Sequence, residues 1–368
     1  MGYVVEYRSG RREIYGEAPA AFTVSVCDAR QFQRILTANS YSVALDFIRG
    51  RFDIRGDLLA ALRWRERRFH RGVLDWLWSL GGRLAPVRLE TWFQSRDRAA
   101  RNIRFHYDVS NEFYRQFLDA RMVYSSGLFE EPRWSLEQAQ EARLERICKD
   151  LELRPGERFL DVGCGWGSLL VHAAERFAVQ AMGCTLSHQQ YEFTTSLLRA
   201  RSLERTASVK EVDYRELSRR FDKVSSIGMF EHVGRHRLLR YFAKIYGLLE
   251  DGGLFLNSGI TRPETVSDDA ETWFLLRRVF PGGELAHLSE VVRAAESVGF
   301  RILRIVSQRN DYARTCEEWV SRLRRNRDRC VGLVGEEIYR TWLLYLAASA
   351  VNFDSGQTDD FSILMRKG

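Results

Sequence analysis

Short apolar runs alternate with helical stretches over most of the second half of the chain. A helix is predicted over SLEQAQEARLERICKDLEL, with Ser135 as its N-cap and Pro155-Gly156 beyond its end. Apolar runs follow in RFLDVGC, VQAMGCTLS, TASVKEVDY, DKVSSIGM and GGLFLNSGI, with helical stretches at 168–177, 188–201 and 236–249 among them. Strands that alternate with helices predict an α/β fold with a parallel, doubly wound sheet.

Two later segments, FRILRIVSQ and DFSILMRKG, predict two more strands, the last of them on an edge of the sheet. The stretches at 264–298 and 312–350 have helical patterns. We expect them to be insertions into the sheet domain or coverings of it.

The N-terminal part has a different pattern. AFTVSV alternates apolar and polar residues as a half-buried strand does, and a helix-like stretch follows from Asp28 to Ile48. RGRFDIRGDLLAALRW then predicts a short strand or turn, Asp57 as an N-cap, and a helix. Because 368 residues exceed one average domain, we predict a small α+β domain over residues 1–95 and a larger domain over residues 96–368.

Composition narrows the class of protein. The six cysteines are scattered, with no C-x-x-C pair and no histidine at zinc spacing, so we expect reduced thiols, no metal site and a cytoplasmic protein. The N-terminus has no secretory pattern, and the longest apolar run, WLLYLAASAV, is far shorter than a membrane-spanning helix requires.

The net charge of +7 is concentrated in one segment. Between Arg63 and Arg104 there are eleven arginines and four acidic residues, interleaved with tryptophan and phenylalanine. Such a segment is compatible with nucleic-acid binding, with an anionic bilayer surface or with an ordinary solvated helical face, and charge alone does not choose among them.

A glycine-rich turn is the strongest local signal. FLDVGCGWGSLL reads as a strand, a tight turn and a helix start, and Gly163 and Gly165 permit close approach of a ligand to the backbone. The third glycine comes one residue too early for the dinucleotide fingerprint, and the next strand ends without the acidic residue that binds a ribose in that motif. These departures favour S-adenosylmethionine over NAD, with a purely structural turn as the alternative.

Several motifs together resemble one family. RNIRFHYDVSNEFYRQFLDARMVYSSGLF, FLDVGCGWGSL, GCTLSHQQ, VDYREL, SSIGMFEHVG and RNDYARTCEEW occur in an order that closely resembles the cyclopropane-fatty-acyl-phospholipid synthases and their mycolic-acid-modifying relatives. The upstream DFIRGRFDIRGDLLAAL resembles the sterol-carrier-like N-terminal domain of the longer, phospholipid-acting members. The resemblance implies a Rossmann-type class I methyltransferase that uses S-adenosylmethionine on an unsaturated acyl chain.

The same resemblance assigns cofactor-binding residues. Tyr124 and Ser125 match positions that contact the methionine part, and Gly163 and Gly165 match the glycine-loop contacts. The positions that match ribose and adenine contacts are Thr185, Gln190, Asp213 and Tyr214. For Thr185 and Gln190, a helix N-cap and a surface amide are the alternative.

Methyl transfer to an alkene produces a carbocation that no heteroatom stabilises, so the site must be dry, rich in π faces or negative charge, and equipped with a base. Tyr107, Phe113, Tyr114 and Phe230 are candidates for the π faces, with core packing as the alternative. Tyr107 matches a family tyrosine near the reacting centre.

Glu231 follows the apolar run KVSSIGMF, at the end of a strand where doubly wound sheets bind ligands, with a carboxylate that caps a neighbouring helix as the alternative. The resemblance implies that Glu231 and Tyr312 help to hold a bicarbonate ion that accepts the proton at ring closure. Ser126 and Ser258 occupy the positions of the family's cysteine and histidine in that set. Bicarbonate is therefore in doubt, and three outcomes stay open: an anion held differently, water or a larger anion in its place, or no such base and a methyl- or methylene-branched product.

We therefore expect a C-methyltransferase at the inner face of the cytoplasmic membrane that acts on unsaturated phospholipid acyl chains. Its expected partners are the unsaturated phospholipid, an anionic membrane surface and, as in longer family members, a second copy of the chain in a homodimer. A methyltransferase for a soluble small molecule and a non-catalytic lipid-binding protein are the alternatives, and nucleic-acid modification ranks lowest.

Overall fold

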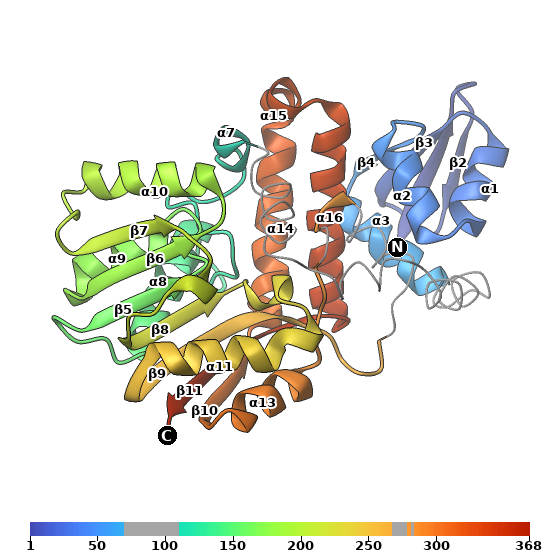
Figure 1. The fold of residues 1–368 in the computed structure, drawn as a ribbon. Coiled ribbons are helices and arrows are strands. Elements are labelled where there is room, and N and C mark those ends of the chain that lie inside the picture. Colours follow the sequence, from blue (N-terminus) through green and yellow to red (C-terminus); the bar gives the residue numbers. More distant parts are fainter. Residues whose placement is uncertain (70–109, 267–277, 281–282) are drawn as a thin grey trace.

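Two separate β-sheets organise the chain, and a pair of long helices lies between them (Figure 1). The structure is a computed structural model that describes residues 1–69, 110–266, 278–280 and 283–368. The two long helices are α14 (Arg309–Arg325) and α16 (Glu336–Ser355). The predicted boundary between residues 95 and 96 lies outside the described residues and stays a prediction.

The larger sheet has seven strands in the order β10-β11-β9-β8-β5-β6-β7. In chain order they are β5 (Arg158–Val162), β6 (Gln180–Thr185), β7 (Ala207–Glu211), β8 (Phe221–Ile227), β9 (Leu249–Thr261), β10 (Phe300–Ser307) and β11 (Asp359–Lys367). The strands from β5 to β9 pair in parallel, as the alternation of strands and helices predicted. Every predicted apolar run in this part of the chain is a strand.

Helices cover both faces of this sheet. One face packs against α8 (Leu136–Asp150), α9 (Ser168–Phe177) and α10 (His188–Ala200), and the other against α11 (Leu238–Leu248) and α13 (Leu288–Ser297). The N-terminus of α8 forms the predicted cap: Ser135 and Gln138 make a reciprocal capping box. The sheet is therefore doubly wound.

The edge position predicted for the last strand is wrong. β11 lies inside the sheet, antiparallel to both β9 and β10, and β10 is the edge strand on that side. Ile363 and Met365 of β11 are almost completely buried, whereas β10 alternates little and is largely exposed. Strand order depends on contacts between distant segments, so the hydrophobic pattern of one strand does not determine it.

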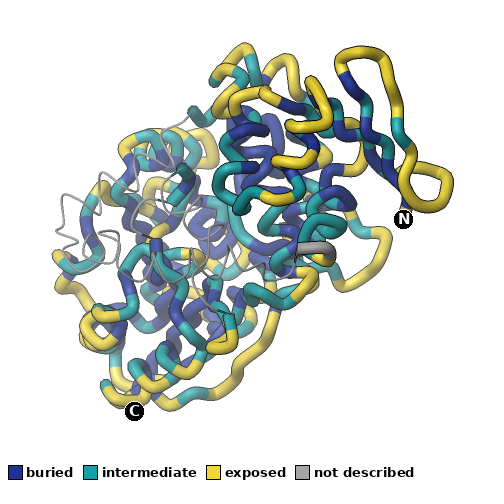
Figure 2. Tube along the Cα trace, turned by 90° about the vertical axis from the view of Figure 1, so that its right-hand side faces the viewer, coloured by how far each residue is buried: buried dark blue, intermediate teal, exposed yellow. Residues whose placement is uncertain are grey.

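The N-terminal unit is a four-stranded sheet in the order β2-β1-β3-β4, with helices beside it. Its elements are β1 (Gly2–Tyr7), β2 (Arg12–Tyr15), β3 (Ala20–Val26), α1 (Ala29–Thr37), α2 (Ser40–Ile48), β4 (Asp53–Gly56) and α3 (Leu58–Phe69). Asp57 caps α3 as predicted, because its carboxylate accepts a hydrogen bond from the Ala60 N–H at 2.9 Å. Figure 2 shows exposed positions along the turns beside the N-terminus and buried ones behind them.

Five further short elements lie in the described residues. They are α7 (Asn111–Tyr114), η1 (Tyr214–Glu216), η2 (Phe230–His232), η3 (Arg235–Arg237) and α15 (Arg327–Val334), which connects α14 to α16. All six cysteines are free thiols. No helix in the described ranges has both the length and the hydropathy needed to cross a bilayer.

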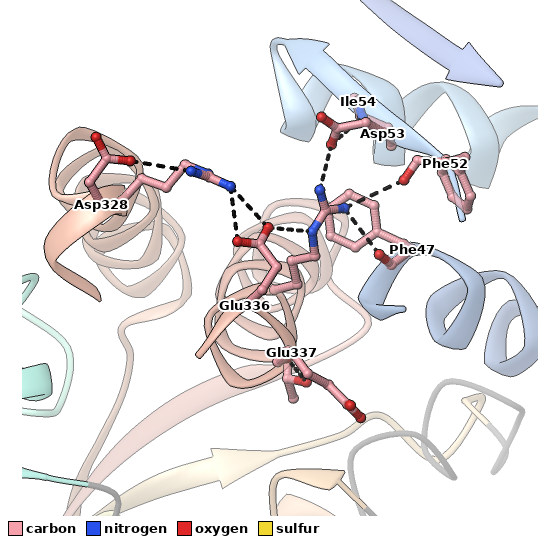
Figure 3. Close-up of polar contacts among 10 residues, drawn as sticks. Phe47, Phe52, Asp53, Ile54, Asp328, Glu336 and Glu337 are labelled. Carbon is pink, nitrogen blue, oxygen red and sulfur yellow. Dashed lines mark hydrogen bonds and ion pairs between the residues drawn. The ribbon is translucent and has the colours of Figure 1, made fainter. Parts of the chain in front are cut away.

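Helix α16 joins the N-terminal unit to the rest of the molecule. It packs against α2 and α3, and one hydrophobic cluster contains residues of the N-terminal sheet together with residues of α14 and α16. Arg340 of α16 donates to the carbonyl oxygens of Phe47 at 3.1 Å and Phe52 at 3.4 Å, and pairs with Glu336 at 2.7 Å (Figure 3). The same guanidinium lies 3.4 Å from Asp53 of β4 (Figure 3).

Arg340→Met should weaken this junction, since it leaves the carbonyl oxygens of Phe47 and Phe52 without their charged donor and leaves Glu336 paired with Arg327. We expect the free energy of unfolding, measured by urea denaturation, to fall by about 2 kcal/mol. Arg329→Met is the matched control, because its exposed guanidinium lies 3.9 Å from Glu112, and it should change stability by less than about 0.5 kcal/mol. Equal stability of the two variants would contradict the role of Arg340.

Candidate active site

A cavity of about 580 Å³ lies at the carboxyl ends of the parallel strands. The loops that follow β5, β6, β7 and β8 all contribute to its lining. This is the edge at which doubly wound sheets bind ligands. The lining includes every residue predicted to bind the cofactor: Tyr124, Ser125, Gly163, Gly165, Thr185, Gln190, Asp213 and Tyr214.

The glycine loop leaves room for a ligand against its backbone. Gly163 and Gly165 have φ angles of +79° and +53°, which disfavour residues with a Cβ. A Cβ added at Gly163 would lie 3.0 Å from Met229, whereas one added at Gly165 would meet no atom within 4 Å. The open space beside Gly165 fits a bound molecule, and the N-terminus of α9 follows directly.

Two predicted residues after β6 contact each other. The Thr185 hydroxyl donates to Gln190 Oε1 at 2.8 Å, and the Ser187 N–H donates to the Thr185 hydroxyl at 3.2 Å. The N-cap of α10 is Ser187, not Thr185. Both side chains are almost completely buried, so Gln190 is not a surface amide. Because its Oε1 accepts from Thr185, the side-chain NH₂ group is the part of Gln190 that can donate to a ligand.

After β7, Asp213 is the N-cap of η1 and accepts hydrogen bonds from the backbone and side chain of Arg215. Tyr214 packs edge-on against Tyr241, with ring centroids 5.7 Å apart. Burial raises the pKa of Tyr214 to about 12, so its hydroxyl stays protonated near neutral pH. A carboxylate and an aromatic ring lie side by side at this end of the cavity.

Tyr124 links the cavity to a wall of aromatic rings. It lines the cavity, and its ring centroid lies 5.1 Å from Trp319 and 5.5 Å from Tyr114. Trp342 of α16 lies 6.2 Å from Tyr124. The backbone carbonyl of Ser125 accepts from Gln140 Nε2 at 2.9 Å, which holds this part of the wall on α8.

Two titratable groups that line the cavity have shifted pKa values. Burial lowers the pKa of His232 to about 4, so the imidazole that lines the cavity is uncharged near neutral pH. Asp161, at the end of β5, accepts from the Ser225 hydroxyl at 2.6 Å, and burial raises its pKa to about 6. His232 therefore adds no positive charge to the cavity, whereas Asp161 is mostly ionised near neutral pH.

Glu231 lies in η2, directly after β8, and 9% of it is exposed. Its Oε1 accepts from the Ile260 N–H at 2.7 Å, while its Oε2 has no hydrogen-bond partner among the described residues. Burial is the main cause that raises the pKa of Glu231 to about 7, and the charge of Asp360 adds to it. Ile260 packs against the hydrophobic cluster that contains Trp319, and the Glu231 carboxylate is close enough to Tyr312 for its charge to raise the pKa of that hydroxyl.

The two serines are completely buried. Ser126 donates to the Gly127 carbonyl at 2.9 Å. Ser258 accepts from Arg143 Nη2 at 2.9 Å, and its hydroxyl oxygen lies 3.3 Å from Asp360 Oδ1 and 3.4 Å from Gln308 Oε1.

The remaining predicted residues have different positions. Tyr312 stacks on Phe353, with ring centroids 4.4 Å apart, and burial raises the pKa of its hydroxyl. Tyr114, Phe113 and Phe230 are buried core residues, and Tyr114 also contacts Tyr124. Tyr107 lies outside the described residues, so its role stays a prediction.

Sequence reasoning missed Arg143 and Asp360. Arg143 is 1% exposed, burial lowers the pKa of its guanidinium, and Asp360 opposes that effect. Gln140 and Arg143 face inward from α8 beside Leu136, Leu144 and Ile147. Two polar residues in the apolar stripe of an amphipathic helix were the available signal.

Comparison with known proteins places this geometry in a family. A sequence model described as mycolic acid cyclopropane synthetase matches residues 94–363. A probable fatty acid methyltransferase of Pseudomonas putida is 36% identical over 329 residues, which cover 87% of this chain and 81% of that protein. Cyclopropane mycolic acid synthase 3 of Mycobacterium tuberculosis (strain ATCC 25618 / H37Rv) is 33% identical, over 70% of this chain and 94% of that protein.

A solved structure extends this likeness to the fold. The crystal structure of mycolic acid cyclopropane synthase CmaA1 complexed with SAH and CTAB has a TM-score of 0.70 and 32% identity, over 73% of this chain and 98% of that one. The fold is that of an S-adenosylmethionine-dependent methyltransferase of the Rossmann-like class I. Within that class, the chain belongs to the mycolic acid cyclopropane synthetase family. The resemblance found in the motifs, the α/β fold, the enzyme class and the methyl donor are confirmed.

A pair of glycine variants tests the cavity as the cofactor site. Gly165→Ala and Gly156→Ala both place a Cβ at positive φ in open space, but only Gly165 lines the cavity. Both should lose about 1 kcal/mol of stability. Only Gly165→Ala should weaken S-adenosylhomocysteine binding, by at least about tenfold in calorimetry. The same affinity in both variants would show that the ligand does not lie against this loop.

Proposed function

We propose that this enzyme transfers the methyl group of S-adenosylmethionine to a double-bond carbon of unsaturated phospholipid acyl chains. The product is a cyclopropane or a methyl-branched chain. The observation that carries the proposal is the aromatic wall that begins at Tyr124 in the cavity and continues through Trp319, Trp342 and Tyr312. Packed π faces exclude water and stabilise a developing cation, which an alkene acceptor requires.

The cavity fits S-adenosylmethionine, which supplies an electrophilic sulfonium methyl group when it is bound. In this proposal Tyr124 and Ser125 hold the methionine part, and Gly163 and Gly165 let it approach the backbone. Asp213 and Tyr214 hold the adenosine end, together with Thr185 and Gln190. The neutral His232 adds no like charge to repel a sulfonium.

Three features support a membrane phospholipid as the acceptor. The P. putida relative is named as a fatty acid methyltransferase, and the N-terminal unit is fixed to α16, which also carries Trp342 of the wall. The arginine and tryptophan residues between Arg63 and Arg104 suit an anionic membrane surface at the inner face of the membrane. A homodimer remains an expectation of the same proposal.

Vesicles of matched composition test the acceptor. With S-adenosylmethionine in excess, we expect S-adenosylhomocysteine to form with vesicles of a mono-unsaturated phospholipid and not with the fully saturated phospholipid of the same headgroup. Adding anionic lipid should raise the rate, and the effect should weaken at high salt because surface charges are screened. Equal rates with both vesicle types, or methylation of a soluble amine instead, would contradict the proposal.

A further inference from the structure

The proposed reaction needs a proton acceptor, and the structure shows a carboxylate in a suitable state for that task. Glu231 is held by one oxygen only, through the Ile260 N–H, and its Oε2 is buried with no partner in the part of the chain that the structure describes. A carboxylate anchored through one oxygen keeps the lone pairs of the other oxygen for the substrate.

The two buried serines are poorly placed to hold a separate anion. Each hydroxyl has one hydrogen. That of Ser126 is engaged by the Gly127 carbonyl, and that of Ser258 has Asp360 and Gln308 as its acceptors. A bound anion would have to displace these internal bonds.

Charge gives a second argument against a separate anion. Arg143 is the buried cation beside Ser258, and the charge of Asp360 partly offsets the lowering of its pKa by burial. Asp360 and Glu231 also repel each other, since each carboxylate is buried. A further negative ion would add repulsion from both.

From these contacts we propose that the Glu231 carboxylate is itself the general base of the reaction, in place of a bound bicarbonate ion. The proposal rests on the proposed function. Arg143 and Asp360, which both contact Ser258, act as positioning residues.

The step balances in atoms and electrons. The alkene π pair forms a bond to the methyl carbon as the carbon–sulfur bond breaks, which leaves a carbocation on the chain. Glu231 Oε2 then takes a proton. If the proton leaves the transferred methyl group, its C–H pair closes a cyclopropane; if it leaves a chain carbon, the pair forms a new double bond in a methyl-branched chain. The carboxylic acid returns the proton to solvent.

The raised pKa of Glu231 predicts how the reaction rate and the stability change with pH. The charge of Asp360 of β11 acts on Glu231, and the charge of Glu231 in turn raises the pKa values of Tyr312 of α14 and Tyr241 of α11. Because its pKa is raised to about 7 in the fold, turnover should rise as the pH increases through about 7. The protonated form stabilises the fold, so this stability is complete below the ordinary glutamate pKa of about 4.3 and is lost as the pH rises through about 7.

Three measurements on the full chain test the proposal. Carbon-13 NMR of labelled bicarbonate should show no protein-dependent line broadening, with or without S-adenosylhomocysteine. Wild-type methylation of unsaturated vesicles should be the same in carbon-dioxide-free and bicarbonate-supplemented buffer. Glu231→Gln should lower the rate at least about hundredfold, should change S-adenosylhomocysteine affinity by less than about threefold, and should flatten the fall of stability between about pH 4.3 and 7.

Glu296→Gln is the control, because it removes an exposed carboxylate on α13, and it should match the wild type in all three measurements. Bicarbonate binding, a bicarbonate-dependent rate, or a Glu231→Gln enzyme as fast as the wild type would overturn the proposal. If Glu231→Gln fails to fold, the two bicarbonate measurements on the wild type still decide. A wild type that methylates no lipid contradicts the proposed function, whereas bicarbonate dependence with a lipid product contradicts only the identity of the base.

Discussion

Burial of charge is the constraint on which the part of the site around Glu231 depends. Arg143, Asp360 and Glu231 are all removed from water, and each must be compensated within the protein or change its protonation. Ser258 brings the first two together, accepting from Arg143 and lying beside Asp360. That leaves Glu231 with one backbone donor and a raised pKa, which suits a group that gains and loses a proton.

The segment after α7 connects the part of the site around Glu231 to the cavity predicted to bind the cofactor. Tyr124 and Ser125 line the cavity, and Ser126 is buried next to them. Helix α14 fixes the same segment, because Thr315 accepts from the Gly127 N–H at 3.0 Å and Asp311 accepts from the Phe129 N–H at 2.9 Å. The aromatic wall on α14 and α16 is therefore held in register with the cavity, while α16 also carries the N-terminal unit.

Local signals in the sequence predicted much of this structure. Ser135 and Asp57 cap helices as expected, because a helix cap depends only on neighbouring residues. The residues predicted to bind the cofactor line one cavity, because the carboxyl ends of parallel strands meet at one edge of the sheet. Two other features depend on packing between distant segments. One is the position of β11 in the sheet, and the other is the contact between Arg143 and Ser258, which are 115 residues apart in the sequence. No pattern within either segment contains that information. The glutamate was found as a strand-end carboxylate, but its unpartnered oxygen appears only in three dimensions.

The central claim is that a methyl group is joined to a chain carbon and that a proton is then lost. S-adenosylmethionine with a fully deuterated methyl group, supplied with unsaturated phospholipid vesicles, tests it through the mass of the released fatty acids. The account predicts new acyl chains with one added carbon that retain two deuterium atoms after ring closure, or three in a methyl-branched chain. Acyl chains that gain no deuterium, with the label on a headgroup nitrogen or in a soluble product, would contradict it.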